Sequence, residues 1–308
     1  MAGERHIGED FAGQDFSRCD LSGADLSRCN LSGCRLIGAR MVGTILFGAN
    51  LDGAELLGAD LTDADLSECS AVKAGFGHAK LVGAKLFEAQ LAHATFTGAD
   101  LTGADLRSAN LHGCSMRETI LVSCDARAAR MTEADITQAT MDHGNFDGVD
   151  LRQARMAHLS GYTSASWIGT DIRQIDFCGA HLVRSHIMDE NYLHEFRHQS
   201  RANERVYRIW SLTSDCGRSF SRWGLCTLII AVVFCGIFTQ VAIDYGEHQT
   251  WLSPLYYSIV TLTTLGYGDV LPMSTWAQAA SMVEVVIGYV MLGGALSIFT
   301  TKMARRAS

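Results

Sequence analysis

The sequence lacks the usual signatures of catalysis. Its eleven histidines form no HEXXH motif or other set with the spacing of metal ligands, and it has no nucleotide-binding glycine loop and no catalytic triad pattern. We therefore expect no enzymatic activity and no cofactor. His194 and His198 lie one helical turn apart, a spacing that allows a metal or pH-sensitive site. Surface polar residues on a charged helix are the better interpretation of that pair.

Proline is scarce, and a long stretch of the C-terminal third lacks positive charge. The only two prolines among 308 residues are Pro254 and Pro272. No Lys or Arg lies between Trp223 and Thr301. A voltage-sensing helix needs arginines repeated along a membrane span, so this absence excludes an intrinsic voltage sensor.

Two apolar runs are long enough to cross a membrane, which takes about 20 helical residues. Residues 223–243 contain no charge, and residues 276–301 contain only Glu284. Between them, residues 254–264 are too few to span. Pro254 suits a helix start because its missing N–H would be unpaired there. We interpret this segment as a pore helix that enters the membrane and stops, with Pro272 ending the turn that leads back out.

Residues 261–269 read TLTTLGYGD. The central five resemble the selectivity filter of potassium channels, in which backbone carbonyls replace the water shell of the ion: Thr264, Leu265, Gly266, Tyr267 and Gly268. Aiming successive carbonyls the same way needs backbone angles that a Cβ disfavours, hence the two glycines. The hydroxyl of Thr264 would be the innermost ligand. The resemblance implies K⁺ as the permeant ion, bound at these residues alone.

The resemblance extends to the two-transmembrane bacterial potassium channels over about residues 220–303. In that family the acid matched by Asp269 braces the filter, and the glycine matched by Gly288 is a hinge of the inner helix. Thr263 would support the filter. Some relatives carry a Glu at the position of Val260 that pairs with the filter aspartate, so Tyr256 is the alternative partner of Asp269 here. Trp276 matches the aromatic residue at the outer start of the inner helix.

One chain supplies one filter strand, and a ring of carbonyls takes four, so we expect a symmetric homotetramer. Arginines precede the first span and Lys302, Arg305 and Arg306 follow the second. By the positive-inside rule both ends then face the cytoplasm of a cell (inner) membrane. Because no apolar stretch precedes residue 223, we expect no cleavable signal peptide. An outer loop with Asp244 and Glu247 would form a cation-attracting mouth.

Residues 11–156 carry a different pattern, because a large apolar residue recurs every five positions and only Ala71 and Ala126 break the rule. From Leu21 onward, a small residue lies two positions before each of them. A period of five fits neither a helix nor a strand, so the chain must turn a corner every five residues. The pattern resembles pentapeptide-repeat proteins, which implies a right-handed quadrilateral β-helix with the large and small residues pointing inward.

The repeat slips by one residue between Met156 and Tyr162, which we interpret as a bulge. It then resumes at five positions: Trp167, Ile172, Phe177, Leu182 and Ile187. Six of the ten cysteines occupy the small inward slot, where a buried small hydrophobe is a better interpretation than a disulfide or metal cluster: Cys19, Cys29, Cys34, Cys69, Cys114 and Cys124.

We therefore predict three regions: a cytoplasmic β-helix at 1–188, an amphipathic linker at 189–222, and an all-α pore module of two transmembrane helices at 223–308. The linker is predicted to form one helix from Asp189 to Thr213 that caps the open end of the β-helix. Residues 1–188 hold 24 acids and 16 bases, and the remainder has no net charge.

The favoured function is a potassium channel whose β-helix regulates gating or binds an unknown protein or ligand. The alternative is a membrane-anchored β-helix scaffold with a degenerate pore. Some pentapeptide-repeat proteins mimic acidic duplex DNA, but the interspersed bases argue against that role, and we expect no nucleic-acid partner. Glu284 is predicted to be a structural group bonded to pore-helix hydroxyls, with a cavity-lining ion site as the second interpretation.

Overall fold

The computed structural model describes residues 2–175, 180–217, 219–246 and 249–307. The chain divides into two compact units, Met1–His194 and Glu195–Ser308. Two residues used in the sequence predictions, Phe177 and Glu247, lie outside the described ranges.

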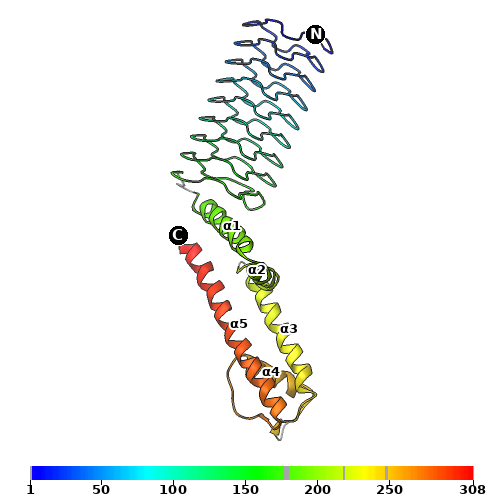
Figure 1. Cartoon of the computed structure of the whole chain (residues 1–308), viewed down its shortest axis with the longest axis vertical. Helices are drawn as coiled ribbons and strands as arrows, with labels where there is room; N and C mark the ends of the chain where they lie inside the picture. The colour runs from blue at the N-terminus through cyan, green and yellow to red at the C-terminus, as the bar shows by residue number, and fades with distance from the viewer. Residues whose placement is uncertain (1, 176–179, 218, 247–248, 308) are drawn as a thin grey trace. The chain divides into compact units, whose positions relative to one another are not determined.

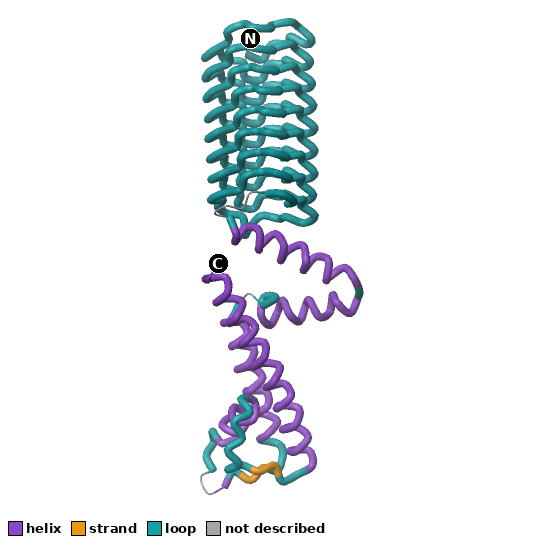
Figure 2. The backbone as a smooth tube through the Cα atoms, turned by 90° about the vertical axis from the view of Figure 1, so that its left-hand side faces the viewer, coloured by secondary structure: helices purple, strands orange, loops and turns teal. Residues whose placement is uncertain are grey.

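The N-terminal unit is a β-helix whose coils stack one on another (Figures 1 and 2). Parallel bridges join one residue in every five to the residue twenty positions later, from Arg5 with Asp25 to Thr140 with Ser160. Twenty residues per coil at five residues per side make four sides, so the predicted four-sided coil is confirmed. The sides carry the backbone hydrogen bonds, as where Leu26 N donates to Ile45 O at 2.8 Å.

The corners explain the period of five. One residue per pentapeptide adopts a left-handed conformation, such as Gly23 with φ 65° or Arg28 with φ 58°. The chain then turns inward, and both predicted inward positions are buried, with Ala24 0% and Leu26 1% exposed. Each coil lays these side chains on the same positions of the next coil, which gives one continuous apolar column.

The predicted one-residue slip is confirmed. The bridge spacing changes from twenty to twenty-one between Thr140–Ser160 and Asn145–Ser166. The extra residue lies in the turn after Ser160, and the column continues beyond it, because Trp167 stacks on Phe146 with ring centroids 4.8 Å apart.

Five of the six inward cysteines are buried and free, and Cys19 is exposed. The prediction for Cys19 is wrong because this residue lies in the first coil of the structure, where no preceding coil covers it. Burial raises the pKa of the Cys69, Cys114 and Cys124 thiols to about 12. A thiol this far from ionisation is a poor nucleophile, so these cysteines are packing residues.

Acids on the outside of the coils are interspersed with arginines. Arg107 lies 2.7 Å from Asp105, and Arg127 lies 2.7 Å from Asp125. The hydrogen bond from Arg107 holds the pKa of Asp105 below its ordinary value, and Arg127 does the same for Asp125. A surface built this way alternates in sign, unlike the continuous negative stripes that mimicry of DNA requires.

Two helices replace the single predicted linker helix. Helix α1 covers His181–Gln199 and α2 covers Arg201–Ser214. The break lies at Ser200, whose extended backbone (φ −158°, ψ 157°) and side chain cap α2 by accepting a hydrogen bond from Asn203 N. Repeat positions Leu182 and Ile187 therefore belong to α1, and their assignment to the β-helix is wrong.

The predicted capping of the β-helix is nevertheless present, in the first half of α1. Val183 and Ile187 are buried in the same apolar cluster as the coils. Asn191 fixes this contact, because its side chain accepts from Gly169 N at 2.7 Å and donates to Trp167 O at 3.0 Å.

Replacing Asn191 with alanine should loosen the cap. The change leaves the backbone groups of the last coil without these partners, at a cost of about 1–3 kcal/mol. We expect a lower thermal midpoint for the β-helix by circular dichroism. Asn203→Ala is the control. Asn203 lies on α2, and its side chain makes an exposed hydrogen bond with Gln199, so this change should leave the midpoint unchanged. Equal midpoints for Asn191→Ala and wild type would show that packing alone holds the cap.

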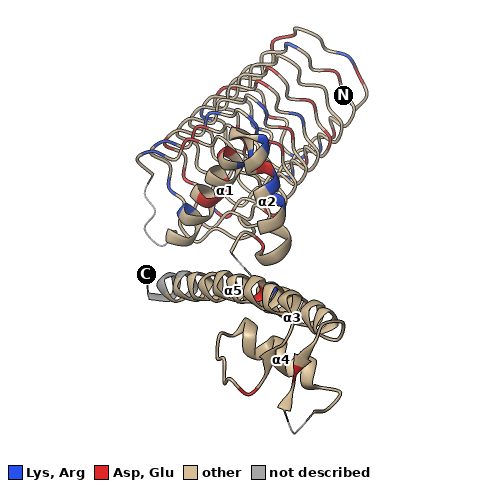
Figure 3. Ribbon diagram, turned by 60° about the horizontal axis from the view of Figure 1, so that its bottom comes forward, with Lys and Arg blue, Asp and Glu red and all other residues tan. Residues whose placement is uncertain are grey.

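The C-terminal unit contains α2 and five further elements: α3 (Phe220–Phe238), β1 (Ile243–Asp244), α4 (Ser253–Leu262), β2 (Leu271–Pro272) and α5 (Thr275–Ala307). The two short strands pair antiparallel and close the loop between α3 and α5 (Figure 2). Charged residues are few on α3, α4 and α5 (Figure 3).

Two helices are long and apolar enough to cross a membrane, Phe220–Phe238 and Thr275–Thr300. The first begins three residues before the predicted run and ends five residues before its end, because the chain turns after Thr239 toward strand β1. The second begins one residue before the predicted run.

Candidate functional site

The site is the segment between α4 and β2. Pro254 lies in the first turn of α4, as predicted, and the helix ends at Leu262, two residues before its predicted end. Leu265 N then donates to Val260 O at 3.0 Å. Thr263 is the C-cap, and its hydroxyl donates to Ile259 O at 2.6 Å.

The segment after α4 has an unusual backbone. Thr264, Gly266 and Gly268 have positive φ angles of 57°, 49° and 77°. A Cβ at either glycine would meet no atom within 4 Å, so backbone conformation, not space, calls for glycine here. A left-handed β-branched residue such as Thr264 is uncommon, and such backbone strain is concentrated at functional sites.

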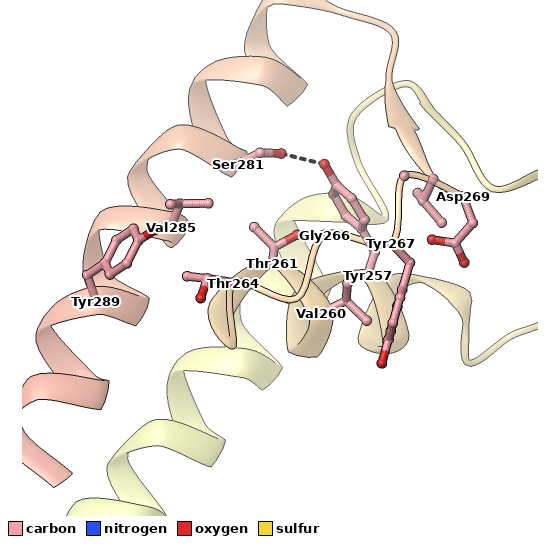
Figure 4. Close-up of a pocket in the computed structure, with 12 residues that line it drawn as sticks. Tyr257, Val260, Thr261, Thr264, Gly266, Tyr267, Asp269, Ser281, Val285 and Tyr289 are labelled. Atoms are coloured by element: carbon pink, nitrogen blue, oxygen red, sulfur yellow. Dashed lines mark hydrogen bonds between the residues drawn. The ribbon is translucent and has the colours of Figure 1, made fainter. Parts of the chain in front are cut away.

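A groove of about 330 Å³ runs along this segment. Figure 4 shows Thr264, Gly266 and Tyr267 on its inner lining, with Val285 and Tyr289 of α5 at one side. The side chains of Leu265 and Tyr267 are 57% and 66% exposed. The segment is thus open along one side in one chain.

Asp269 is hydrogen-bonded to Tyr256, the partner that the sequence analysis gave as the alternative to a glutamate at position 260. The hydroxyl of Tyr256, on α4, donates to Asp269 Oδ2 at 2.7 Å. The bond ties the end of the segment back to the start of α4, across thirteen residues.

Helix α4 is fastened to both long helices by polar contacts. Tyr257 Oη and Ser281 Oγ of α5 lie 2.9 Å apart (Figure 4). Ser258 Oγ hydrogen-bonds with Ala231 O of α3 at 2.9 Å and with Glu284 Oε1 of α5. Glu284 is fully buried, so the expected bond between this carboxyl and an α4 hydroxyl is present.

Gly288 lies where α5 touches the end of α4. A Cβ there would come within 2.1 Å of the Leu262 carbonyl oxygen. The sequence comparison with channels predicted a hinge at this position. The structure assigns Gly288 a packing constraint, which the sequence alone did not reveal because it depends on the approach of two helices.

The sequence analysis also missed a close contact between α3 and α5. Trp223 Nε1 donates to Met291 O at 2.8 Å, and a Cβ at Gly294 would come within 2.2 Å of the Trp223 ring. The GG pair at 293–294 was the available signal, because paired small residues in an apolar helix permit close packing.

His194 and His198 both lie on α1. Within the described ranges, no group of three or more His, Cys, Asp or Glu residues is placed to hold a metal ion.

Two family models match separate parts of the chain. Residues 15–156 match pentapeptide repeats, in eight copies, and residues 224–305 match an ion channel domain. Over 68 residues the chain is 34% identical to the calcium-gated potassium channel TvoK of Thermoplasma volcanium, covering 21% of this chain and 20% of that protein. Over 90 residues it is 30% identical to the rat voltage-gated potassium channel regulatory subunit KCNF1, covering 27% and 18%. The chain thus spans about a fifth of the length of these curated relatives.

Solved structures of pentapeptide-repeat proteins also match. HetL from Nostoc sp. strain PCC 7120 is 21% identical with a TM-score of 0.34, covering 58% of this chain and 87% of that one. QnrB1, a fluoroquinolone resistance protein, is 18% identical with a TM-score of 0.44, covering 60% and 98%. The β-helix is defined by its own bridges, and these likenesses add no detail to it.

Proposed function

We propose that this chain, which joins pentapeptide repeats to an ion channel domain, is one subunit of a potassium-selective channel. The observation that carries the proposal is the TLTTLGYGD segment, with positive φ at Gly266 and Gly268, between two membrane-length apolar helices. Backbone carbonyls of residues 264–268 replace the hydration shell of K⁺ as it passes.

Helix α4 is the re-entrant pore helix in this proposal. Its ten residues reach about 15 Å, half the roughly 30 Å of a hydrocarbon core. Irregular backbone at membrane depth is stable only where protein buries it or it lines an aqueous path. The filter residues therefore lie beside other protein and the ion path, away from lipid.

A homotetramer completes the site. One chain leaves Leu265 and Tyr267 exposed along an open groove, whereas a ring of four filters encloses an ion. The positive-inside rule places both chain ends in the cytoplasm of a cell membrane, so the β-helix is cytoplasmic.

Flux from the purified full-length protein in liposomes tests the proposal. We expect K⁺ efflux well above Na⁺ efflux and a particle with the mass of four chains. Protein-free liposomes are the control. Equal passage of both ions would refute selectivity, and no passage of either would favour a membrane-anchored scaffold.

We propose further that the β-helix constrains the channel gate and that a protein or ligand bound to it shifts the closed and open states. Neither candidate span holds a series of arginines, so voltage alone supplies little gating energy. We therefore propose that the β-helix unit controls channel opening.

Deletion of residues 1–194, the whole N-terminal unit, should change the open probability of single channels while leaving K⁺ selectivity intact. The reason is that the filter lies entirely in the other unit. Single-channel recording of the truncated tetramer measures both properties. An unchanged open probability would leave the β-helix a role in assembly or localisation only.

A further inference from the structure

One carboxyl is fully buried between the helices of the C-terminal unit. Glu284 is 0% exposed, at the contact of α5 with α3 and α4. Its Oε1 is hydrogen-bonded with Ser258 Oγ, and its Oε2 has no partner among the described residues. Ser258 is itself 0% exposed, so its hydroxyl does not face bulk solvent.

The hydroxyl of Ser258 has two neighbours and one proton. Its Oγ lies 2.9 Å from Ala231 O, a carbonyl that can only accept. An ionised Glu284 could also only accept, and one of the two contacts would then lack a hydrogen. A protonated Glu284 supplies that hydrogen: it donates to Ser258 Oγ, and Ser258 donates to Ala231 O.

We infer that Glu284 is a neutral carboxylic acid in the working protein and that its proton completes a relay from α5 through α4 to α3, Glu284 to Ser258 to Ala231. The relay makes Glu284 a positioning residue, since it holds the pore helix from behind and contacts no ion. This role rests on the proposed function, whereas the protonation state does not.

The surrounding elements offer no cation to compensate a carboxylate. Helix α4 carries no charged residue, α3 carries only Arg222, near its start, and the candidate span of α5 carries only Glu284. An unpaired charge inside a span is costly. Within α3, α4 and the candidate span of α5, the other titratable side chains are cysteines and tyrosines: Cys226 and Cys235 on α3, Tyr256 and Tyr257 on α4, and Tyr289 on α5. The hydroxyls of Tyr256 and Tyr257 are engaged with Asp269 and Ser281.

The relay has a consequence for pH. Ionisation of Glu284 at alkaline pH removes one of the two hydrogens, so Ser258 can no longer bond to both Glu284 and Ala231 O. The relay that joins the three helices is then broken, and K⁺ flux should fall. Glutamine keeps the shape and the donor, because its amide N–H₂ can donate to Ser258 Oγ at any pH. Glu284→Gln should therefore assemble, conduct at neutral pH and lose the alkaline inhibition.

Infrared spectroscopy of the full-length protein in lipid bilayers at neutral pH tests the protonation directly. We expect the C=O stretch of a protonated carboxyl, absent in Glu284→Gln and retained in Asp244→Asn, which removes an exposed carboxyl. Ser258→Ala should shift the band, because the acid loses its acceptor, and this variant serves as the second readout if Glu284→Gln fails to assemble.

The spectrum does not require conduction, so a protein that passes no K⁺ would refute the proposed function and leave this inference standing. A wild-type spectrum without that band would overturn the inference. Alkaline inhibition of the same size in Glu284→Gln and wild type would overturn the pH role.

Discussion

Replacing Gly266 with alanine should abolish K⁺ flux through the reconstituted channel. The residue has φ 49°, and alanine in a left-handed conformation costs roughly 1–2 kcal/mol. In the proposed tetramer the cost recurs in every subunit, and a backbone change that relieves it would turn the carbonyls of the proposed filter away from the ion path. Liposome flux of K⁺ measures the loss.

Gly103→Ala is the matched control for this experiment. Gly103 has φ 67° and open space around its Cα, as Gly266 does, but it lies in the β-helix. The control bears the same backbone cost outside the filter and should conduct normally. Wild-type flux in Gly266→Ala would contradict the assignment of the filter. Thr264→Ala, which removes the hydroxyl ligand and the γ-methyl group, should lower K⁺ over Na⁺ selectivity. Thr264→Ser, which removes the methyl group alone, should retain it.

The sequence was most informative where one local pattern determines the structure. A five-residue period specifies a corner every five residues, so the β-helix, its inward positions and even the single slip at 160–166 were predictable. The left-handed backbone at Gly266 and Gly268 was predictable for a similar reason, because glycine at these two positions meets a local conformational requirement.

The errors arose where structure depends on contacts between distant residues. An amphipathic pattern continues through Ser200, and nothing in its periodicity marks the break between α1 and α2. Leu182 and Ile187 fit the repeat in sequence, yet they lie on a helix that covers the last coil. Likewise, the Trp223 bond to Met291 O joins residues 68 positions apart, which no local pattern encodes.

The packing role of Gly288 can be separated from a hinge role by two alanine substitutions on one helix. In Gly288→Ala the new methyl would meet the Leu262 carbonyl oxygen at 2.1 Å. That atom is backbone, so α4 must move, at a cost of about 1–3 kcal/mol per subunit. Because Leu262 directly precedes the filter segment, we expect lower thermal stability of the tetramer and loss of K⁺ selectivity.

Gly293 lies five residues further along α5, and for Gly293→Ala we expect no loss of stability or selectivity. A Cβ there would meet nothing within 4 Å, and alanine in a helix interior is favoured over glycine by roughly 0.5–1 kcal/mol. The Gly293 variant should therefore be as stable as wild type or more so, with its selectivity intact. The opposite outcome is that Gly288→Ala matches Gly293→Ala in stability and selectivity and lowers only the open probability. Glycine at 288 would then be required for bending of α5 and not for the close approach of α4.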